Sequence, residues 1–585
     1  MKERAPWLVG LASVPFLLGS MGCSRGGDAG SGGRNLNVLL ISLDSTRRDL
    51  LSAYGRRPQL APREVTSPNL DRLAAEGVLF EQASATSSWT LPSHVSLLTG
   101  VPEVVHGVDH DSRTPDPSFS TLAERLAAAG YRTAGFFSGP YLEPAFGFGR
   151  GFERYVPCYG TELSNASEAL VAALHGADED GVRDDSVASR ASRAARARAE
   201  LALESLAQRD RSSDRVTDQA LAELELAAAD ERPFFLFAHY FDPHYDYAPP
   251  EVEEQRFDPA YHGGLSPANF YANPAIAAGP RDFLGTRERV LSERDLQHFV
   301  ALYEGELSWT DAQVGRILAR LDELGLRERT LVILVADHGE EFFEHGGIGH
   351  RRTLYEELVA VPMILRLPGK LPAGVRVSEA VSTLDVVPTV LELVGLARSP
   401  ELYSRGLLPL LSGAAPEARP GPIGRLLFFG VWPHTLSDEN GAREVPVRVA
   451  TLVESYRKGP LKVLRQWSQA RPRASLPEDF RRAIRAEFDR AHGGERLSWI
   501  DLERSPRELP DDFSGDFREP RARAALQEFH DQYARLLEQR RAASVRAPGE
   551  PSGVLEALGY GGEADDAPQG DEFVLPPPGG AVLGR

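Results

Sequence analysis

The amino-acid sequence predicts an α/β protein built on a central, mostly parallel sheet. Three apolar runs, at 37–43, 233–239 and 330–336, are each long enough for one buried strand. Uninterrupted apolar runs of this length are typical of parallel strands that are covered on both faces. Segments with helical periodicity alternate with these runs, which is the pattern of an α/β sheet.

Helical patterns lie between the strand runs. Residues 67–80 carry apolar side chains at helical spacing after a Ser-Pro start, and residues 121–130 form a second expected helix that ends at a glycine. Residues 302–324 have the same periodicity and lead into the last of the three runs. A further strand is expected at 131–137. The order of these elements predicts strands that are joined by helices.

Changes in composition divide the chain into segments. Residues 160–230 are rich in Ala, Arg, Glu and Asp and nearly free of aromatic residues, which predicts a charged helical insertion. The C-terminal residues contain Gly, Pro and acidic clusters that are typical of a disordered tail. The expected segments are an export signal (1–23), a glycine-rich linker (24–34), a main α/β domain (35–400) that contains the insertion, a smaller C-terminal domain (401–545) and the tail (546–585).

The N-terminus has the features of an export signal. Lys2 and Arg4 precede an apolar stretch at 7–18 that is too short to span a bilayer, and small residues then lead to Cys23. This order resembles a bacterial lipoprotein signal, in which Cys23 is lipidated and attaches the protein to a membrane. An ordinary cleaved signal and an uncleaved anchor are the alternatives. The expected location is the cell envelope, either the periplasm or the outer membrane as a lipoprotein.

The charge balance limits the partners. The 585 residues include 65 Lys and Arg and 84 Asp and Glu, which gives a net charge of -19 at pH 7. Nucleic-acid binding depends on clustered positive charge, so no nucleic-acid partner is expected. A small anionic substrate remains compatible with this balance, because one basic pocket can lie within an acidic protein.

Polar residues follow two of the expected strands at the points where the strands end. Asp44 follows the run 37–43, and Asp337 and His338 follow the run 330–336. In open α/β sheets the ligand site lies at the carboxyl ends of the strands, so these side chains are expected to meet. Two carboxylates and an imidazole suit a divalent cation. One such Asp alone is more simply a helix cap, but two strand ends with the same chemistry favour a metal site.

Several segments that contain these residues resemble one known family, the sulfatases. Residues 37–55 are similar to the opening segment of sulfatases, and TLPSHVSLLTG at 90–100 resembles their nucleophile motif. Each motif alone is only moderately specific, but all of them occur in the order of the family. The likeness covers about residues 35–510 and continues through the segments 66–80, 233–250, 336–357, 381–395 and 499–508.

The resemblance implies a fold and a cofactor. The fold is the alkaline-phosphatase-like three-layer α/β/α arrangement, with a mostly parallel central sheet and a smaller α+β C-terminal domain. Asp44, Asp337 and His338 correspond to metal ligands, and Thr90 corresponds to the nucleophile, which also touches the metal. Ser45 stands where many relatives carry a second aspartate, so one divalent metal ion (Ca, Mn or Zn) is expected.

A second metal ion would need more ligands. Two-metal phosphodiesterases of this superfamily use a further aspartate and two histidines. The spacing of the candidate residues in this chain does not match that pattern, which leaves a single-metal site similar to that of phosphoethanolamine transferases and lipoteichoic-acid synthases. The candidates are Asp242, His244, His345 and His350.

The resemblance also implies residues that contact the substrate. His244 and His350 fall near positions that contact the ester or its leaving group, and they are the expected catalytic partners of Thr90. His94 replaces the arginine that commonly supports the nucleophile. The expected substrate-binding residues are Arg47, His94 and His345.

Two departures from the family pattern predict the reaction. Sulfatases use a formylglycine made from Cys or Ser, and Thr90 cannot be converted in this way. The segment 130–138 lacks the lysine of the family's second motif, so the sulfate-holding lysines of arylsulfatases have no evident counterparts. A threonine oxygen activated by a metal can attack phosphorus, and water can then release the product. These departures favour a phosphoryl ester over a sulfate ester.

The expected function is a metal-dependent hydrolase that cleaves a phosphate, phosphonate or sulfate ester through a Thr nucleophile. The substrate is expected to be a small anionic ester or an esterified glycan or lipid. The alternatives are a true sulfatase, a transferase that moves a phospho-group to a cell-envelope glycan or lipid, and an inactive binding lipoprotein. Elemental analysis separates the binding protein from the enzymes, and product analysis with an acceptor separates the transferase.

Overall fold

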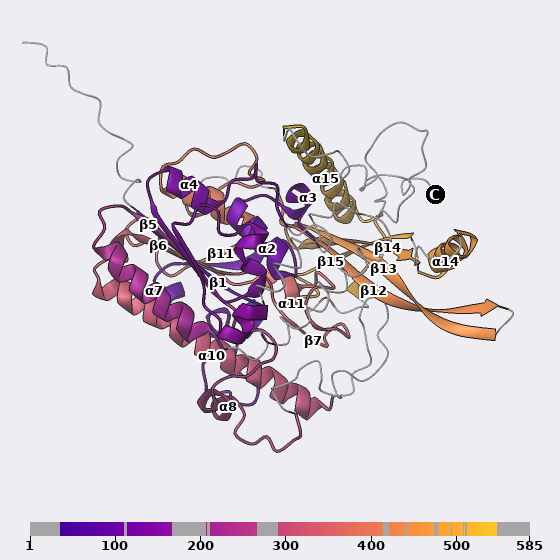
Figure 1. The fold of residues 1–585 in the computed structure, drawn as a ribbon, viewed down its shortest axis with the longest axis horizontal. Helices are drawn as coiled ribbons and strands as arrows, with labels where there is room; N and C mark the ends of the chain where they lie inside the picture. The colour runs from indigo at the N-terminus through magenta and orange to yellow at the C-terminus, as the bar shows by residue number, and fades with distance from the viewer. Residues whose placement is uncertain are drawn as a thin grey trace, which may run out of the picture.

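A computed structural model of the chain contains a large mixed sheet and a smaller antiparallel sheet (Figure 1). The signal and linker expected at 1–34, most of the tail expected at 546–585 and most of residues 167–210 lie outside the described residues. Among the helices that are described, none is long and apolar enough to cross a membrane. The structure describes residues 36–109, 114–166, 206, 211–265, 291–412, 420–438, 441–472, 478–492, 494–506, 508 and 512–546.

Nine strands of the described chain form the main sheet. They are β1 (Asn37–Leu43), β2 (Val78–Ser84), β3 (Arg132–Phe137), β4 (Arg154–Pro157), β5 (Phe234–Tyr240), β6 (Thr330–Ala336), β9 (Ala360–Val361), β10 (Met363–Arg366) and β11 (Val375–Ser382). Their order is β11-β2-β10-β6-β1-β5-β3-β4, and β9 pairs with β2. β1 lies between β5 and β6 and is parallel to both, whereas β9 and β10 run antiparallel to their neighbours. The mostly parallel sheet confirms the predicted fold class.

The three central strands are apolar because both of their faces are covered. Every residue of β1, β5 and β6 is buried. Their sequences (NVLLISL, FFLFAHY and TLVILVA) lack the polar alternation of a strand with one exposed face. The strands predicted from these runs are confirmed, with bounds that agree to within one residue.

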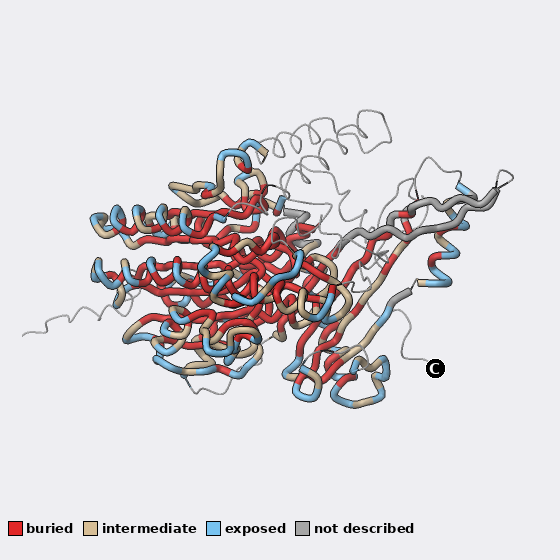
Figure 2. Tube along the Cα trace, turned by 90° about the horizontal axis from the view of Figure 1, so that it is seen from below, coloured by how far each residue is buried: buried red, intermediate tan, exposed pale blue. Residues whose placement is uncertain are grey.

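Helices cover both faces of the main sheet (Figure 1). Figure 2 shows the buried interior as a band between layers whose outer surfaces are partly exposed. This is the predicted three-layer arrangement. One face carries α1 (Pro68–Ala75), α7 (Ser213–Ala228) and α10 (Glu293–Glu323), and the other carries α2 (Thr90–Thr99), α4 (Leu122–Ala128) and α12 (Val386–Leu393).

The helix expected over 67–80 is shorter than predicted. α1 ends at Ala75, and the chain enters β2 at Val78. A Cβ on Gly77 would lie 2.3 Å from the carbonyl oxygen of Leu365, so only glycine lets the chain pass this close to β10. The sequence pattern did not reveal this turn, because the apolar residues of β2 continue the helical spacing of α1.

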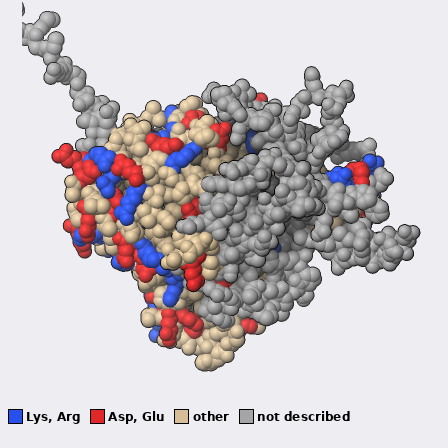
Figure 3. All heavy atoms as spheres, viewed as in Figure 1, with Lys and Arg blue, Asp and Glu red and all other residues tan. Residues whose placement is uncertain are grey.

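The described end of the expected insertion is part of the helical layer. α7 packs against α10, β3 and β5, and it buries Val216, Ala220, Leu224 and Ala227 at helical spacing. On the face drawn in Figure 3, acidic and basic side chains of the described residues are interspersed. In α7 the charged residues of this range therefore lie mainly on the outer face of a packed helix.

A cluster of short elements follows β6 at its carboxyl end. β7 (Glu341–Phe342) and β8 (Ile348–Gly349) form a hairpin, and α11 (Glu356–Val359) comes next. The loop from residue 337 to 357 therefore lies beside the strand ends. The remaining short elements are α3 (Glu103–His106), α8 (Glu251–Phe257), α13 (Leu408–Leu411) and the 3-10 turns Arg48–Leu50, Ser52–Tyr54, Pro140–Leu142, Pro144–Phe146, Arg327–Arg329 and Thr383–Asp385.

The C-terminal domain is a four-stranded antiparallel sheet with two helices. Its strands, in sheet order, are β12 (Ile423–Asp438), β13 (Gly441–Lys458), β14 (Leu461–Arg471) and β15 (Gly494–Asp501), and its helices are α14 (Glu478–Ala491) and α15 (Pro520–Arg546). Leu402 and Leu407 still belong to the core of the main domain. The C-terminal sheet therefore begins later than residue 401, the expected start of this domain.

A buried ion-pair network joins the two domains. Nζ of Lys462 on β14 lies 3.0 Å from Glu356 at the start of α11 and 2.9 Å from Glu508. Burial works against the charge of Glu356, but the charges of Lys462 and two arginines outweigh it and lower its pKa to about 2. The network fixes the C-terminal sheet beside the loop that follows β6.

Candidate active site

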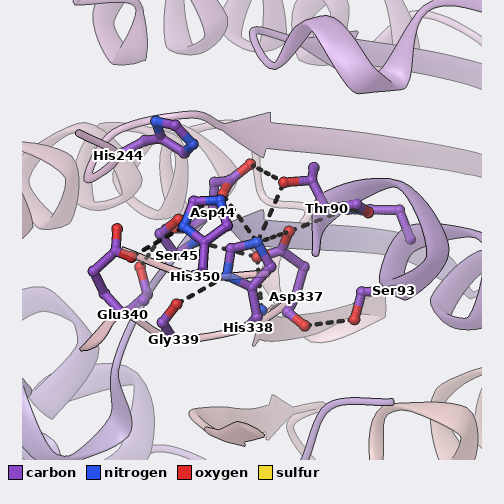
Figure 4. Close-up of polar contacts among 12 residues, drawn as sticks. Asp44, Ser45, Thr90, Ser93, His244, Asp337, His338, Gly339, Glu340 and His350 are labelled. Atoms are coloured by element: carbon purple, nitrogen blue, oxygen red, sulfur yellow. Dashed lines mark hydrogen bonds and ion pairs between the residues drawn. The ribbon is translucent and has the colours of Figure 1, made fainter. Parts of the chain in front are cut away.

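The predicted metal ligands meet at the carboxyl ends of β1 and β6. These neighbouring strands place Leu43 opposite Ala336, so Asp44 and Asp337 leave the sheet side by side. Ligand atoms of Asp44, Asp337 and His338 all lie within 4.8 Å of one another, and all three residues are buried. Figure 4 shows the three side chains turned toward one another. The structure thus brings together the residues that the strand-end rule selected.

Thr90 lies against the same cluster, at the start of α2. Its Oγ1 is 3.3 Å from Oδ2 of Asp44 and 3.2 Å from Nε2 of His338, and both are hydrogen-bond distances (Figure 4). Thr90 is the first residue of the helix, where the positive end of the helix dipole favours negative charge. Every residue of α2 is buried, which fixes the position of the hydroxyl.

The backbone determines which nitrogen of His338 faces Thr90. Nδ1 lies 2.9 Å from the carbonyl oxygen of Gly339, which can only accept a hydrogen bond, so Nδ1 carries a proton. In the neutral ring, Nε2 then keeps its lone pair and directs it at the hydroxyl of Thr90. Burial lowers the pKa of His338, which favours this neutral form. Nε2 can therefore bind a metal ion or accept a proton.

Ser45 holds one oxygen of each aspartate. Its backbone N–H donates to Oδ1 of Asp337 at 3.2 Å, and its hydroxyl donates to Oδ1 of Asp44 at 2.9 Å. These two hydrogen bonds leave the Oδ2 atoms of both aspartates available on the inner side of the cluster. Ser45 has a φ of 50°, a left-handed conformation that costs free energy for a residue other than glycine. This strained turn places both of its donors against the aspartates.

The charges of this cluster fit a divalent cation. Burial raises the pKa of Asp337 well above its usual value, and the charge of Asp44 raises it further. Burial also opposes the charge of Asp44, but a contact with His239 and the nearby imidazoles lower its pKa overall. Oδ2 of Asp337 has no hydrogen-bond partner among the described residues. A cation would supply the missing positive charge, and the imidazole nitrogen in this oxygen-rich set favours Zn or Mn over Ca.

His244 and His350 lie beside the cluster, and in both rings Nδ1 is held by a nearby acceptor. Nδ1 of His244 donates to the carbonyl oxygen of Tyr245 at 2.7 Å, and Nδ1 of His350 lies 3.0 Å from Oε1 of Glu340. The ring centroid of His350 is 4.4 Å from that of His338 and 5.0 Å from that of His244. Burial lowers the pKa of His244 to about 4 and that of His350 well below its usual value. An anion bound here would raise both pKa values.

Arg47 was predicted as a substrate contact, but its donors are engaged within the protein. Its guanidinium donates to both carboxylate oxygens of Asp49, at 2.9 and 2.8 Å, and to the carbonyl oxygen of Glu340 at 3.1 Å. It also pairs with Glu344. These contacts hold the loop after β6, and they do not fit the predicted contact with an ester.

His94 was also predicted as a substrate contact, and it lies against the backbone of Thr90. Nδ1 donates to the carbonyl oxygen of Thr90 at 2.9 Å, and Nε2 lies 2.9 Å from the hydroxyl of Ser42. The side chain is completely buried, and burial lowers its pKa to about 3. These contacts fit a residue that supports Thr90 and do not fit one that touches substrate.

His345, the third predicted substrate contact, is an internal cation. Nδ1 lies 2.5 Å from Oε1 of Glu357 and Nε2 lies 2.6 Å from the carbonyl oxygen of Glu508, so both nitrogens face acceptors and carry protons. Burial opposes this charge, but the hydrogen bond with Glu357 outweighs it and raises the pKa of His345 to about 9. Ligand atoms of His345, Glu341 and Glu357 also lie close together, but a doubly protonated ring has no lone pair for a metal.

Arg351 is a cation that lies beside the histidines at the cluster. The sequence alone did not distinguish it from Arg352. The guanidinium carbon of Arg351 lies 5.6 Å from the ring centroid of Trp89 and 4.8 Å from that of Tyr141. Its backbone N–H donates to the carbonyl oxygen of Ser88 at 2.9 Å, and its φ is 77°. The charge of Arg351 lowers the pKa values of the histidines at 244, 338 and 350. A non-glycine residue in this conformation is often functional.

His239 is a second residue whose role the sequence did not reveal. Its position at the end of an apolar run is typical of a core histidine, and the side chain is indeed completely buried. Its Nε2 lies 3.3 Å from Oδ2 of Asp44, and its ring centroid lies 4.9 Å from that of His94. The position of β5 beside β1 brings His239 against a predicted metal ligand.

The three-layer fold and the buried cluster at the strand ends agree with the sequence relatives of the chain, which are hydrolytic enzymes of the sulfatase family in the alkaline phosphatase superfamily. The family model described as sulfatase matches residues 36–396, and the chain belongs to this family. PehA, a multifunctional alkaline phosphatase superfamily protein of Trinickia caryophylli, is 28% identical over 435 residues, covering 65% of this chain and 78% of PehA. Iduronate 2-sulfatase of Mus musculus is 28% identical over 374 residues, covering 58% of this chain and 61% of the relative.

Solved structures share the fold. The phosphonate monoester hydrolase of Agrobacterium radiobacter has a TM-score of 0.56 and 21% identity, covering 86% of this chain and 96% of the hydrolase. A protein solved in complex with its substrate, D-glucosamine-2-N, 6-O-disulfate, has a TM-score of 0.55 and 18% identity, covering 87% of this chain and 98% of that protein. The predicted family and fold are thus confirmed.

Proposed function

We propose that this enzyme hydrolyses a phosphate or phosphonate ester and that Thr90 is its nucleophile. The proposal is supported above all by the position of Oγ1 of Thr90, at 3.3 Å from Asp44 and 3.2 Å from His338. Threonine cannot become the formylglycine of sulfatases, whereas a threonine oxygen can form an ester with phosphorus that water then cleaves. The likeness to a multifunctional alkaline phosphatase superfamily protein supports the same chemistry.

One divalent metal ion would be held by the side chains of the cluster. When bound, such an ion lowers the pKa of a ligating hydroxyl and polarises the ester. Ser45 adds no third carboxylate, so the cluster carries the charge of two aspartates, which one divalent cation balances. The proposed ligands are Asp44, Thr90, Asp337 and His338.

The first step forms a covalent intermediate on Thr90. Oδ2 of Asp44 is at hydrogen-bond distance from the hydroxyl of Thr90, which orients the oxygen for attack on phosphorus, and Nε2 of His338 is left for the metal ion. Oγ1 gives its proton to Oδ2 of Asp44, 3.3 Å away, as the new bond joins Oγ1 to phosphorus, and the bond between phosphorus and the leaving oxygen breaks. Arg351 lies beside the cluster and would neutralise the charge that develops on the other phosphoryl oxygens.

A proton must reach the leaving oxygen in this step. His244 and His350 both have Nδ1 fixed by an acceptor, so a second proton goes to Nε2 when the ring is charged. The negative charge of a bound ester favours that charged form, and Nε2–H can then act as the acid. In the second step water gives a proton to the same histidine and attacks phosphorus, Oγ1 leaves, and a proton returned from Asp44 restores the hydroxyl of Thr90.

The nucleophile is tested with Thr90→Ala and Thr90→Ser. Both purified variants and the wild type are assayed with phenyl phosphate, a phosphate diester, a phosphonate monoester and an aryl sulfate, each with Zn, Mn and Ca. Loss of the attacking oxygen predicts a fall in kcat of at least about a thousandfold for Thr90→Ala, whereas Thr90→Ser keeps part of the activity. Turnover by Thr90→Ala at the wild-type level ends the assignment.

A sulfate ester is the second candidate substrate. The likeness to iduronate 2-sulfatase favours it. The same panel decides between the two, because a true sulfatase turns over the aryl sulfate with a higher kcat/KM than any of the phosphorus esters. Product analysis with a glycan or lipid acceptor identifies a transferase, because the phospho-group then appears on the acceptor instead of being released.

We also propose that the enzyme is exported and attached to a membrane of the cell envelope through lipidated Cys23. The proposal rests on the order of charged, apolar and small residues before this cysteine. Labelled palmitate should enter the wild-type protein in cells and should not enter Cys23→Ser. Equal labelling of both proteins, or of neither, contradicts lipidation at Cys23.

A further inference from the structure

A pocket separates the loop after β8 from the C-terminal sheet. Its volume is about 310 Å³, within the range of pockets that hold small molecules. Neither Thr90 nor the proposed metal ligands line it, so it is distinct from the metal cluster. Its polar and aromatic lining includes His345, Arg352, Tyr355, Gln466, Arg496 and Phe513, and Ser498 also lines it.

The alternation of the C-terminal strands presents several of these side chains together. Gln466 on β14 lies opposite Arg496 on β15, and Leu464 lies opposite Ser498. These residues are two apart on each strand, so they share one face of the sheet. Val463, which precedes Leu464 on β14 and so faces the other side of the sheet, belongs instead to the core under α15. The pocket wall is therefore a regular face of the sheet and is held by the packing of the opposite face.

The pocket carries positive charge without a balancing carboxylate. Arg352 and Arg496 both line it, and no acidic residue is among its described lining residues. Neither arginine forms an ion pair within the described part of the chain, in contrast to Arg47, which pairs with two carboxylates. Unpaired guanidinium groups at a pocket bind carboxylate, sulfate or phosphate groups with good geometry.

The remaining surface suits a ring that also carries hydroxyl groups. The rings of Tyr355 and Phe513 lie 5.9 Å apart between centroids, and Tyr355 is held by stacking on His345 at 3.7 Å. Such flat apolar surfaces accept the face of a ring. The amide of Gln466 and the hydroxyl of Ser498 can exchange hydrogen bonds with ring hydroxyls.

We propose that this pocket binds an acidic sugar, meaning a sugar ring that carries a carboxylate, sulfate or phosphate group. The arginines take the acidic group, the aromatic rings take the face of the sugar, and the polar side chains take its hydroxyls. This combination distinguishes an acidic sugar from a neutral sugar, which leaves both arginines unused, and from an inorganic anion, which leaves the aromatic wall unused.

The acidic sugar would be the leaving group of the ester that is cleaved. This assignment rests on the proposed hydrolase function. One loop serves both sites: His350 and Arg351 lie at the metal cluster, and Arg352 lines the pocket. Ser88, two residues before Thr90, ties this loop down, because its carbonyl oxygen accepts from Arg351 at 2.9 Å and its hydroxyl donates to the carbonyl oxygen of residue 353 at 2.7 Å. A substrate that fills the pocket would therefore contact the same loop that carries His350 and Arg351.

The pocket is tested with two probes that contain no ester for this enzyme to cleave. 4-Nitrophenyl β-D-glucuronide and 4-nitrophenyl β-D-glucoside differ only in the carboxylate, and their affinities for the full-length protein are measured by calorimetry. One charge-assisted contact predicts at least about tenfold tighter binding of the glucuronide. Arg352→Gln and Arg496→Gln should reduce this preference, whereas Arg504→Gln, an exposed arginine of the same domain, should keep it. Equal affinities for the two probes, or a preference that both pocket variants retain, overturn the proposal.

The leaving-group assignment is tested by competition. The glucuronide should raise the KM of the wild type for phenyl phosphate without lowering kcat, and Arg496→Gln should weaken this inhibition about tenfold. Binding without any effect on KM overturns the assignment to the leaving group. Absence of ester hydrolysis by the wild type with every metal would contradict the proposed function instead, and the calorimetric result would still decide whether the pocket binds an acidic sugar.

Discussion

Nε2 of His338 lies 3.2 Å from the hydroxyl oxygen of Thr90. The contact joins the residue after β6 to the first residue of α2, and the carbonyl oxygen of Gly339 fixes the ring so that a lone pair faces the hydroxyl. The aspartates on either side lie close enough to share a cation with this pair. The proposed reaction depends on this relationship, because it places the proposed nucleophile and a proposed metal ligand in direct contact.

Replacement of His338 should remove both metal and activity. His338→Ala leaves two buried carboxylates without their nitrogen partner, so metal affinity and kcat/KM should each fall at least about a hundredfold. Elemental analysis of purified protein and phosphate-ester kinetics measure the two effects. His262→Ala changes an exposed histidine and is the matched control. Full metal content with normal kinetics in His338→Ala would show that the cluster is not the metal site.

Ser45 should contribute to metal affinity through its two hydrogen bonds to the aspartates. Ser45→Gly keeps the backbone donor and relieves the positive φ, but it loses the hydroxyl that orients Asp44. The dissociation constant of the metal should rise about tenfold with little change in thermal stability. Titration of metal-free protein measures this constant, with Ser412→Gly at an exposed position as the control. An unchanged constant contradicts the orienting role of the hydroxyl.

Arg351 should hold the anionic part of the ester. Arg351→Gln removes its charge and should raise KM for a phosphate monoester about tenfold, because one charge-assisted contact is lost. Arg351→Lys keeps the charge and should recover part of the affinity, although it lacks the planar group that packs on Trp89 and Tyr141. Arg518→Gln, at an arginine that is 87% exposed, is the control. A KM that is the same in all three variants excludes this role.

His345 should stabilise the protein mainly at lower pH. Its pKa is raised from 6.5 to about 9, so its contribution is fully present below about pH 6.5 and is lost as the pH rises through about 9. His345→Gln keeps a donor for Glu357 but not the charge. The variant should therefore melt about 2 °C below the wild type at low pH, and the gap should close above about pH 9. A gap that widens with pH has the wrong sign for this ion pair.

The sheet and the cluster of polar residues at its strand ends could be predicted because their signals are local. β1 and β6 are uninterrupted apolar runs, and a polar residue follows each of them directly. The topology of parallel strands then places Asp44 and Asp337 at one edge without any knowledge of side-chain packing. The family likeness added Thr90, whose position at the start of a helix follows from the segment around it.

The surroundings of the expected substrate contacts could not be predicted in the same way, because they depend on partners from distant segments. In sequence Arg47 is a plausible contact for an anion, but in the structure its guanidinium pairs with Asp49 and Glu344. Arg351 and Arg352 are equivalent in sequence, and only the left-handed turn at Arg351 sends one toward Trp89 and Tyr141.

For His94 the sequence did contain a signal, which is the composition of the helix around it. His94 lies one helical turn after Thr90 in a helix that contains no Asp, Glu, Lys or Arg. Such a helix is buried on all sides, which leaves its histidine without access to a ligand. The composition of α2 therefore already favoured a supporting role over a contact with substrate.

The most direct test of the proposed reaction is to trap the intermediate on Thr90. Metal-loaded wild-type enzyme is mixed with excess phenyl phosphate, quenched in acid within the first turnover, and digested for peptide mass spectrometry. The proposed reaction predicts a phosphoryl group on Thr90, which is absent without metal and absent in Thr90→Ala. Phosphate released with a burst-free time course and an unmodified Thr90 peptide, under conditions in which the enzyme turns over, would contradict the proposed role of Thr90.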